Sequence, residues 1–251
     1  MGIRTDDLGA PISLPSDVGR VVSLVPSLTE SIAATRPDAL VAATIWCTQP
    51  PDLDVERVRG TKNPDVQRII ELRPDLVLAN KEENRRTDVE RLRAAGIPVW
   101  VTVTETVPGA IESLRRMFED ALGWEEPEWL RQCRDLWAGE VLQPTRGVAI
   151  PIWRDPWMVV GRDTFTGDLA ARLGLANVYA AAAERYPHVT LDEIAAREPD
   201  LVLLPDEPYR FTAEDGPEAF GSLRTALVSG RHLTWYGPSL LDARAVVLDC
   251  L

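Results

Sequence analysis

The sequence predicts an α/β protein with two similar lobes, each built around a parallel sheet. Pro-Asp-Leu-Val-Leu occurs at residues 74–78 and again at 199–203, an offset of 125 residues in a chain of 251. Over the longer windows 66–84 and 191–209, seven of nineteen aligned positions are identical. Both copies are continuously apolar, which is typical of strands covered on both faces. Strands and helices alternate around them, as they do in α/β units.

The first half of the chain is predicted to alternate strands with helices. Continuous apolar runs predict strands at 21–25, 40–45, 75–79 and 99–103. Apolar positions at helical spacing predict helices at 65–72 and 87–95, and the segment after Pro26 begins a further helix near Thr29 and Glu30. Gly96 follows the second helix, at a position where glycine commonly ends one.

The second half repeats this order. Apolar runs predict strands at 147–152 and 201–204, and helical spacing predicts helices at 167–173 and 191–196. Gly174 ends the first of these helices. The predicted domain organisation is therefore an N-terminal extension (1–18), an N-terminal α/β lobe (19–107), linker helices (108–143) and a C-terminal α/β lobe (144–251).

Two helices are predicted in the linker. The first covers 108–122 and is ended by Gly123. The second opens at Glu126-Pro127, with proline in the first turn, and its apolar stripe continues to Val141. Its roughly 16 residues predict a length of ~24 Å, enough for a connection between the lobes.

Composition excludes some classes of partner. The net charge of −12 would repel a phosphate backbone, so we expect no nucleic-acid partner. No apolar run approaches the ~18 residues of a membrane span. The three cysteines have neither disulfide-framework nor zinc spacing. The first residues lack the apolar segment of a secretory leader, which predicts a cytoplasmic location, with an extracytoplasmic one if a leader has been removed.

Ligands of parallel sheets bind beyond the carboxyl ends of the strands, so the loops there are the candidate site. We expect the loops of the two lobes to line one cleft. Tryptophan offers a flat apolar face with one donor, which suits a large planar ligand. The candidate ligand-binding residues are Trp46, Lys62, Asn63, Glu82, Glu83, Asn84, Arg85, Trp153, Arg154, Asp155, Trp157, Glu207, Tyr209, Trp235 and Tyr236. For any single tryptophan the alternative is that it closes the core of its lobe.

Catalytic signals are weak. No nucleophile elbow, metalloprotease helix or phosphate-binding loop is present. The two histidines, His188 and His232, have no metal-ligand spacing, so no metal site is predicted. Cys47 has no histidine near it in sequence. The acidic pairs Glu82–Glu83 and Asp206–Glu207 leave an enzymatic alternative open, since paired carboxylates can serve as acid and base.

A family resemblance is carried by three stretches: RVVSLVPSLTE (20–30), GTKNPDVQRIIELRPDLVLANKEENRRTDVERLRAAGIPVWV (60–101) and LDEIAAREPDLVLLPDEPY (191–209). The chain resembles the helical-backbone metal receptors, the class III substrate-binding proteins of ABC importers that bind cobalamin or iron siderophores. The resemblance implies two Rossmann-like lobes joined by a single connecting helix, with a ligand clamped between them. It implies a cobalamin-like, tetrapyrrole or metal-chelate ligand, with a corrinoid as the suggested one.

The resemblance also bears on individual residues. In the cobalamin-binding members aromatic side chains cover the corrin, and Trp157 and Trp235 match that part by position, whereas Thr61 or Lys62 stands where those members have a tryptophan. In importer members each lobe presents a carboxylate to arginines of the permease. The matching positions here are Gln67 and Asp192, so the first carboxylate is missing, which argues against docking on an ABC permease. Two alternatives to a free-standing binding protein remain: a biosynthetic enzyme on this scaffold, and an importer component whose leader has been removed.

Overall fold

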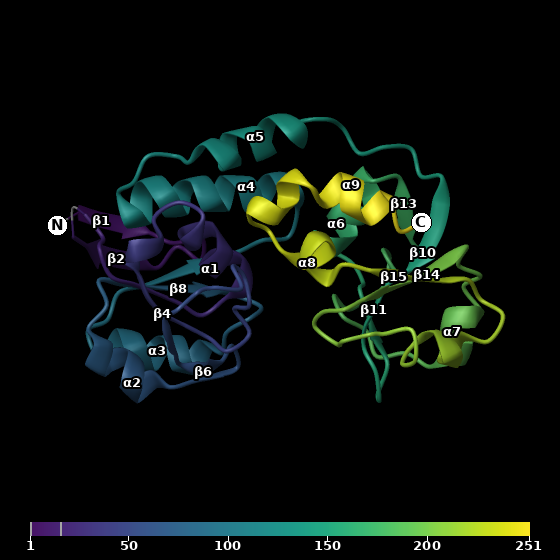
Figure 1. Cartoon of the computed structure of the whole chain (residues 1–251), viewed down its shortest axis with the longest axis horizontal. Helices are drawn as coiled ribbons and strands as arrows, with labels where there is room; N and C mark the ends of the chain where they lie inside the picture. The colour runs from purple at the N-terminus through teal and green to yellow at the C-terminus, as the bar shows by residue number, and fades with distance from the viewer. Residues whose placement is uncertain (1, 16) are drawn as a thin grey trace. The chain divides into compact units, whose positions relative to one another are not determined.

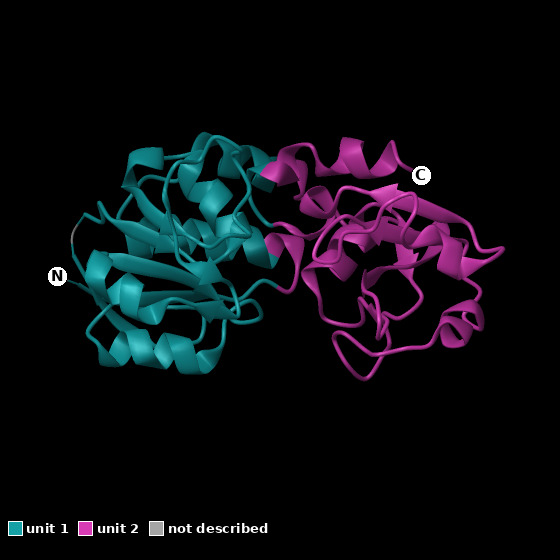
Figure 2. Cartoon of the chain, turned by 60° about the horizontal axis from the view of Figure 1, so that its bottom comes forward, with its two compact units in different colours: residues 1–104, 109–135, 236–238 teal, residues 105–108, 136–235, 239–251 magenta. Residues whose placement is uncertain are grey.

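The computed structural model describes residues 2–15 and 17–251, which form two compact units (Figure 2). Unit 1 covers residues 1–104, 109–135 and 236–238, and unit 2 covers 105–108, 136–235 and 239–251. Of the predicted linker, residues 109–135 thus belong to unit 1, whereas residues 108 and 136–143 belong to unit 2. Residues 1 and 16 of the predicted N-terminal extension lie outside the described part.

The elements of the first half begin with a short hairpin and continue as an α/β unit (Figure 1). In chain order they are β1 (Gly2–Thr5), β2 (Pro11–Leu14), β3 (Val21–Ser23), α1 (Pro26–Ala33), η1 (Pro37–Ala39), β4 (Leu40–Ala43), β5 (Glu56–Arg57), β6 (Arg59–Gly60), β7 (Asn63–Pro64), α2 (Val66–Leu72), β8 (Leu76–Asn80), α3 (Arg86–Ala94) and β9 (Val99–Thr102). Helix α4 (Val107–Arg116), the π-helical η2 (Met117–Leu122) and α5 (Glu128–Leu136) follow.

The second half repeats the alternation with more loop. Its elements are β10 (Arg146–Ala149), β11 (Pro151–Trp153), β12 (Met158–Val159), α6 (Phe165–Arg172), β13 (Leu175–Asn177), α7 (Leu191–Ala195), β14 (Leu201–Pro205), η3 (Pro217–Phe220), β15 (Thr225–Val228), α8 (Gly230–Thr234), η4 (Pro238–Leu241) and α9 (Ala243–Leu248). Among the described helices, none is long and apolar enough to cross a bilayer.

The two main sheets share one order of four parallel strands, to which unit 1 adds β5 at the edge, and this confirms the predicted α/β class. The sheet of unit 1 has the order β5-β4-β3-β8-β9 and that of unit 2 the order β13-β10-β14-β15. All neighbours in both sheets are parallel. The repeated phrase forms β8 in one sheet and β14 in the other, with a parallel partner on each side. Every residue of both strands is buried, as their unbroken apolarity predicts.

The aspartate of the repeated phrase accepts backbone hydrogen bonds from the adjacent strand in each unit. The Asp75 carboxylate accepts hydrogen bonds from the backbone N–H groups of Gly19 and Arg20, at 3.0 and 2.9 Å. The Asp200 carboxylate accepts one from the N–H of Gly147 at 2.6 Å. Each aspartate therefore ties the start of its own strand to the start of the adjacent strand, β3 or β10.

Each sheet is buried by helices and loops. In unit 1, α2 and α3 supply Ile69 and Leu92 to a core with Val22, Val77 and Val99, while α4 lies on the opposite side of the sheet (Figure 1). In unit 2, one sheet face packs on α7 and on a group of aromatic side chains described below. Helix α6 contacts β13 and α8.

The N-terminal extension packs on the sheet of unit 1, and the sequence did not predict this packing. Strands β1 and β2 form an antiparallel hairpin, and the loop between them docks on β9. The side chain of Asp6 is fully buried, where it accepts a hydrogen bond from Arg93 at 2.7 Å and from the Val101 N–H at 3.3 Å. The N–H of Asp7 donates to the carbonyl of Val101 at 3.2 Å.

Two predicted boundaries are wrong. The run 147–152 is broken because Pro151 has no N–H to donate to the sheet, and the chain leaves at Ala149 to form the β11–β12 hairpin. Helix α5 ends at Leu136 rather than near Val141, so its nine residues span about 14 Å. The next residue, Trp137, is buried in unit 2, where its indole N–H donates to the Leu240 carbonyl at 3.0 Å.

Replacing Asp6 tests the role of the hairpin. We expect Asp6→Ala to lower the free energy of unfolding by about 2–4 kcal/mol, because it leaves buried N–H donors and the Arg93 guanidinium without their carboxylate. Urea titration followed by circular dichroism measures the change. The exposed Asp135 is a matched control, and Asp135→Ala should change stability by no more than about 0.5 kcal/mol. Equal effects of the two substitutions would contradict a structural role for the hairpin.

Candidate functional site

Two buried asparagines hold the loop that follows β8 in unit 1. The side-chain amide of Asn80 donates to the hydroxyls of Thr102 and Thr104 at 3.2 and 3.3 Å, and its oxygen accepts from the Glu82 N–H at 2.8 Å. The Asn84 amide donates to the Thr61 carbonyl at 2.9 Å, and its oxygen accepts from the Asn80 N–H at 2.9 Å. The polar atoms of Asn84, a predicted ligand residue, are thus engaged in shaping the loop.

The shaped loop carries several of the predicted side chains. The ammonium of Lys62 donates to the carbonyl oxygen of Glu82. Glu83 is half-buried, and burial raises the pKa of its carboxyl while the nearby Lys62 opposes the rise. Tyr236 is buried beside them, and burial, with the Glu83 charge added, raises the pKa of its phenol well above the usual value. Its phenol therefore remains protonated and able to donate.

Exposed predicted residues lie on the same edge of the sheet. Trp46 follows β4 and is 60% exposed, and its neighbour Ile45 is 54% exposed. Asn63 lies exposed in the turn of β6 and β7, and Arg85 lies exposed immediately before α3. Two adjacent exposed apolar side chains form a small apolar patch at this edge, the kind of surface on which a ligand can stack.

In unit 2 the predicted aromatic residues gather into one cluster. Trp157 stacks on Phe211 with ring centroids 5.9 Å apart, and Phe211 contacts Tyr209 at 4.7 Å. Tyr209 in turn meets Trp153 edge to face at 5.7 Å. Trp157 is 8% exposed and belongs to the core, whereas Trp153 is 45% exposed. The cluster thus runs from the core of unit 2 to an open indole.

Acidic partners surround Arg154 at the edge of this cluster. Its guanidinium pairs with Asp215 and with Glu218, and lies 3.6 Å from the carboxylate of Asp155. The hydrogen bond from Arg154 holds the pKa of Glu218 below its usual range. The Tyr209 hydroxyl donates to Asp215 at 2.6 Å, which raises the pKa of the phenol.

Asp215 and Glu218 were missed by the sequence analysis. They lie more than sixty residues from Arg154 in a segment without periodic pattern, so no sequence signal joins them to it.

Trp235 is positioned by a predicted acidic residue. Its indole N–H donates to the Glu207 carboxylate at 2.8 Å, and the side chain is only 5% exposed. Like Trp157, it is therefore buried. Of the four loop tryptophans, Trp46 and Trp153 are the two that remain open.

The chain is similar in sequence to proteins named for vitamin B12. The chain is 25% identical over 204 residues to a "Vitamin B12-binding protein" of Pectobacterium carotovorum, covering 77% of this chain and 74% of that protein. It is 26% identical over 195 residues to the protein of the same name from Photorhabdus laumondii, covering 74% and 70%. No family model matches the sequence.

Solved structures share the fold over nearly the whole chain. The periplasmic vitamin B12 binding protein BtuF of Vibrio cholerae superposes with a TM-score of 0.71 at 20% identity, covering 92% of this chain and 96% of that one. The periplasmic heme-binding protein RhuT from Roseiflexus has a TM-score of 0.71 at 21% identity, covering 93% and 99%. The chain therefore has the fold of these periplasmic binding proteins, which confirms the expected fold. Its similarity to the vitamin B12-binding proteins agrees with the resemblance seen in the sequence.

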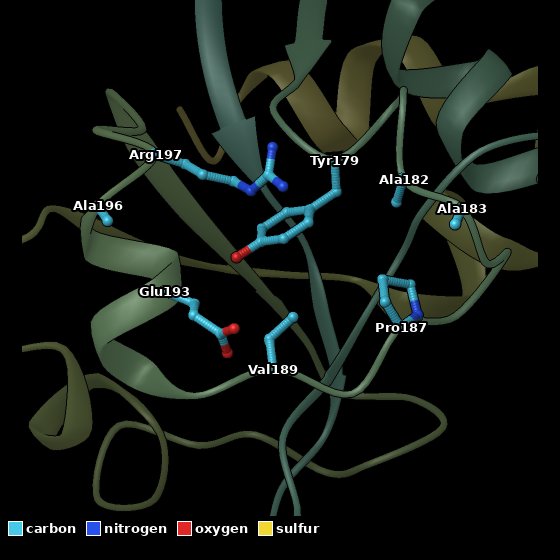
Figure 3. Close-up of a pocket in the computed structure, with 8 residues that line it drawn as sticks. All are labelled: Tyr179, Ala182, Ala183, Pro187, Val189, Glu193, Ala196 and Arg197. Carbon is cyan, nitrogen blue, oxygen red and sulfur yellow. The ribbon is translucent and has the colours of Figure 1, made fainter.

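Unit 2 also has a shallow cavity that the sequence did not predict (Figure 3). Its volume is about 470 Å³, and it is lined by Tyr179, Ala182, Ala183, Pro187, Val189, Glu193, Ala196 and Arg197. The Arg197 guanidinium lies 4.2 Å from the ring centre of Tyr179 and donates to the Val178 carbonyl. The Glu193 carboxylate caps α7 by accepting from Thr190. The charged groups of this cavity therefore serve local structure.

Groups that could support catalysis or hold a metal are few among the described residues. Within residues 2–15 and 17–251, no three His, Cys, Asp or Glu side chains are grouped so that they could hold a metal ion. Cys47 is fully buried and lies 2.9 Å from the Thr29 hydroxyl. Burial raises the pKa of the Cys47 thiol, which disfavours the thiolate that a nucleophile needs.

The pH dependence of stability tests the environment of Glu83. Because folding raises its pKa above 4.5, Glu83 contributes stability below pH 4.5 that is lost as the pH rises through the folded pKa. Glu83→Gln should therefore gain stability relative to the native chain as the pH rises above 4.5. Urea titrations at pH values from about 4 to 8 measure this difference, since this range covers the titration of carboxyls and histidines.

Glu71 provides a control of opposite sign. Hydrogen bonds from Gln67 and Arg68 lower its pKa, so its contribution is present above pH 4.5 and is lost as the pH falls through the folded pKa. Glu71→Gln should therefore lose stability relative to the native chain as the pH rises, by a small amount because the group is exposed. A pH-independent difference for Glu83→Gln would contradict the buried environment described here.

Thiol labelling tests the burial of the cysteines. Cys250 is exposed, whereas Cys47 and Cys133 are buried, and burial raises the pKa of Cys133 to about 12. At neutral pH iodoacetamide should modify Cys250 alone in the folded protein and all three cysteines in denaturant, as peptide mass spectrometry would show. Labelling of Cys47 at the rate of Cys250 would instead reopen a nucleophilic role.

Proposed function

We propose that this substrate-binding protein binds a corrinoid, with a haem-type tetrapyrrole as the second candidate. The observation that carries the proposal is the pair of open indoles, Trp46 in unit 1 and Trp153 in unit 2, each at the strand-end loops of its own unit. An exposed indole offers a planar apolar face on which a conjugated macrocycle can stack. The relatives named for vitamin B12 and the neighbours named for haem support this class of ligand.

Hydrogen-bond acceptors in the unit 1 loops suit a corrinoid. A corrin ring carries neutral amide groups at its edge, which donate hydrogen bonds, whereas haem carries two propionate carboxylates. Glu82 and Glu83 can accept from amides, while Lys62 and Arg85 at the same edge could pair with a carboxylate. The net charge of −12 places the corrinoid, with its neutral amides, ahead of haem.

Calorimetric titration with cyanocobalamin, haemin and a ferric siderophore tests the proposal. We expect cyanocobalamin to bind with a Kd below about 100 μM, and more tightly than haemin. Absence of binding by all three at that limit would refute the ligand class, and tighter binding of haemin would reverse the order of the two candidates.

Substitution of Trp153, the open indole in unit 2, tests its contribution to ligand binding. Trp153→Ala should weaken cyanocobalamin binding by about 1–2 kcal/mol, roughly 5- to 30-fold, because it removes the stacking face. Trp129→Phe is a suitable control, since Trp129 lies on α5 and its indole N–H donates to Thr35. An unchanged affinity in Trp153→Ala would remove Trp153 from the binding surface.

The cellular location and the import partner remain proposals. Structural neighbours named as periplasmic favour an extracytoplasmic location over the cytoplasmic one that the sequence predicts. The prediction against docking on a permease rests on Gln67, which stands where one carboxylate is expected, whereas Asp192 supplies the other. The enzymatic alternative has no supporting observation among the described residues.

A further inference from the structure

Trp46 is held in place by its backbone rather than by burial of its side chain. The N–H of Ile45 donates to the Arg59 carbonyl at 2.8 Å, and the N–H of Cys47 donates to the Thr44 carbonyl at 3.2 Å. The residue on one side of Trp46 is therefore tied to β6, and the residue on the other side is fully buried. The indole itself is 60% exposed, so something other than a surrounding core must set its orientation.

Gly60 lies directly against the indole. A Cβ atom added at Gly60 would lie 3.1 Å from Nε1 of Trp46 and 3.6 Å from its Cδ1. It would also lie 2.6 Å from the side-chain oxygen of Asn63, which faces Gly60 across the β6–β7 pair. Real Cβ atoms essentially never come within 3.0 Å of such a neighbour, so a larger residue would displace the amide of Asn63 and press on the indole.

The backbone conformation does not explain this glycine. Gly60 is not among the residues with a positive φ angle, so an alanine could adopt its backbone conformation without strain. The constraint is one of space, because a Cβ here would meet the ends of two side chains, the amide of Asn63 and the pyrrole edge of Trp46, and both would have to shift. This close approach leaves more than half of the indole surface open at the end of the unit 1 sheet.

We infer that Gly60 is a positioning residue for Trp46: it sets the orientation in which the indole presents its open face to the ligand. The inference rests on the proposed function and extends it, because it assigns a role to a residue that does not itself touch the ligand. It also identifies the aromatic platform of unit 1 as Trp46, on the loop after β4. Lys62, next to this turn, instead donates to the Glu82 carbonyl in the loop after β8.

A double-mutant cycle on ligand affinity tests the inference, with cyanocobalamin as the probe. Trp46→Ala should weaken binding about tenfold, and Gly60→Ala about threefold to fivefold. If Gly60 acts through the indole, the double variant should bind no more weakly than Trp46→Ala alone. Multiplication of the two effects in the double variant would overturn the inference, because Gly60 would then act independently of Trp46.

A second pair of variants, made in Asn63→Ala, separates the effect of the Gly60 contact with Asn63 from that of its contact with Trp46. In Asn63→Ala the nearest obstacle to a Cβ at residue 60 is removed, so Gly60→Ala in this background folds with less strain and meets chiefly the indole. Its further loss of affinity, about threefold, should remain. Loss of that effect would assign the role of Gly60 to Asn63 and overturn the inference.

Fluorescence keeps the test independent of the ligand. The difference between the emission of the native chain and that of Trp46→Phe isolates the signal of Trp46, and Gly60→Ala should shift this signal and its quenching by acrylamide. Failure of the native chain to bind cyanocobalamin or haemin would refute the proposed function. An unchanged Trp46 signal in Gly60→Ala would refute the positioning role, whatever the ligand.

Discussion

The central strand of each unit depends on one constraint: it is buried on both faces and has a parallel partner on both edges. Its polar backbone can be satisfied only within the sheet, because no water reaches it. Asp75 and Asp200 fix one end by accepting hydrogen bonds from the start of the adjacent strand. With that end fixed, the chain leaves the other end at a defined place, and the loops there carry the candidate ligand residues.

The two units use different chemistry to shape those loops. In unit 1 the amides of Asn80 and Asn84 join the loop after β8 to its neighbours through buried hydrogen bonds. In unit 2 the Asp206 carboxylate accepts from the Gly230 N–H at 2.6 Å, and Glu207 accepts from Trp235. The scaffold is therefore repeated, whereas the residues that follow it are not, and the divergence lies where a ligand would be recognised.

The sequence predicted the scaffold well for a physical reason. Strands buried on both faces must be continuously apolar, and helices that cover them must be apolar at helical spacing, so both leave a local pattern. The same local rule fails where tertiary contacts decide. The fully buried Asp6 that anchors the N-terminal hairpin, and Trp137, which ends α5 by packing in unit 2, have no local pattern that distinguishes them from surface or helical residues.

The sequence predicted which loops form the candidate site better than it predicted which of their side chains are exposed. The position of a tryptophan after a strand does not reveal whether its ring turns inward, as in Trp157 and Trp235, or stays open, as in Trp46 and Trp153. That choice depends on distant partners: Phe211 and Phe220 for Trp157, Glu207 for Trp235. The ion pairs of Arg154 with Asp215 and Glu218 are likewise visible only in three dimensions.

The central claim is that ligand recognition belongs to the strand-end loops of each unit. Hydrogen–deuterium exchange with peptide resolution, measured with and without saturating cyanocobalamin, tests this claim most directly. The account predicts slower exchange on binding in residues 44–47, 80–85, 153–157 and 205–211, with little change elsewhere. Protection of residues 179–197, around the cavity of unit 2, without protection of the strand-end loops would contradict it.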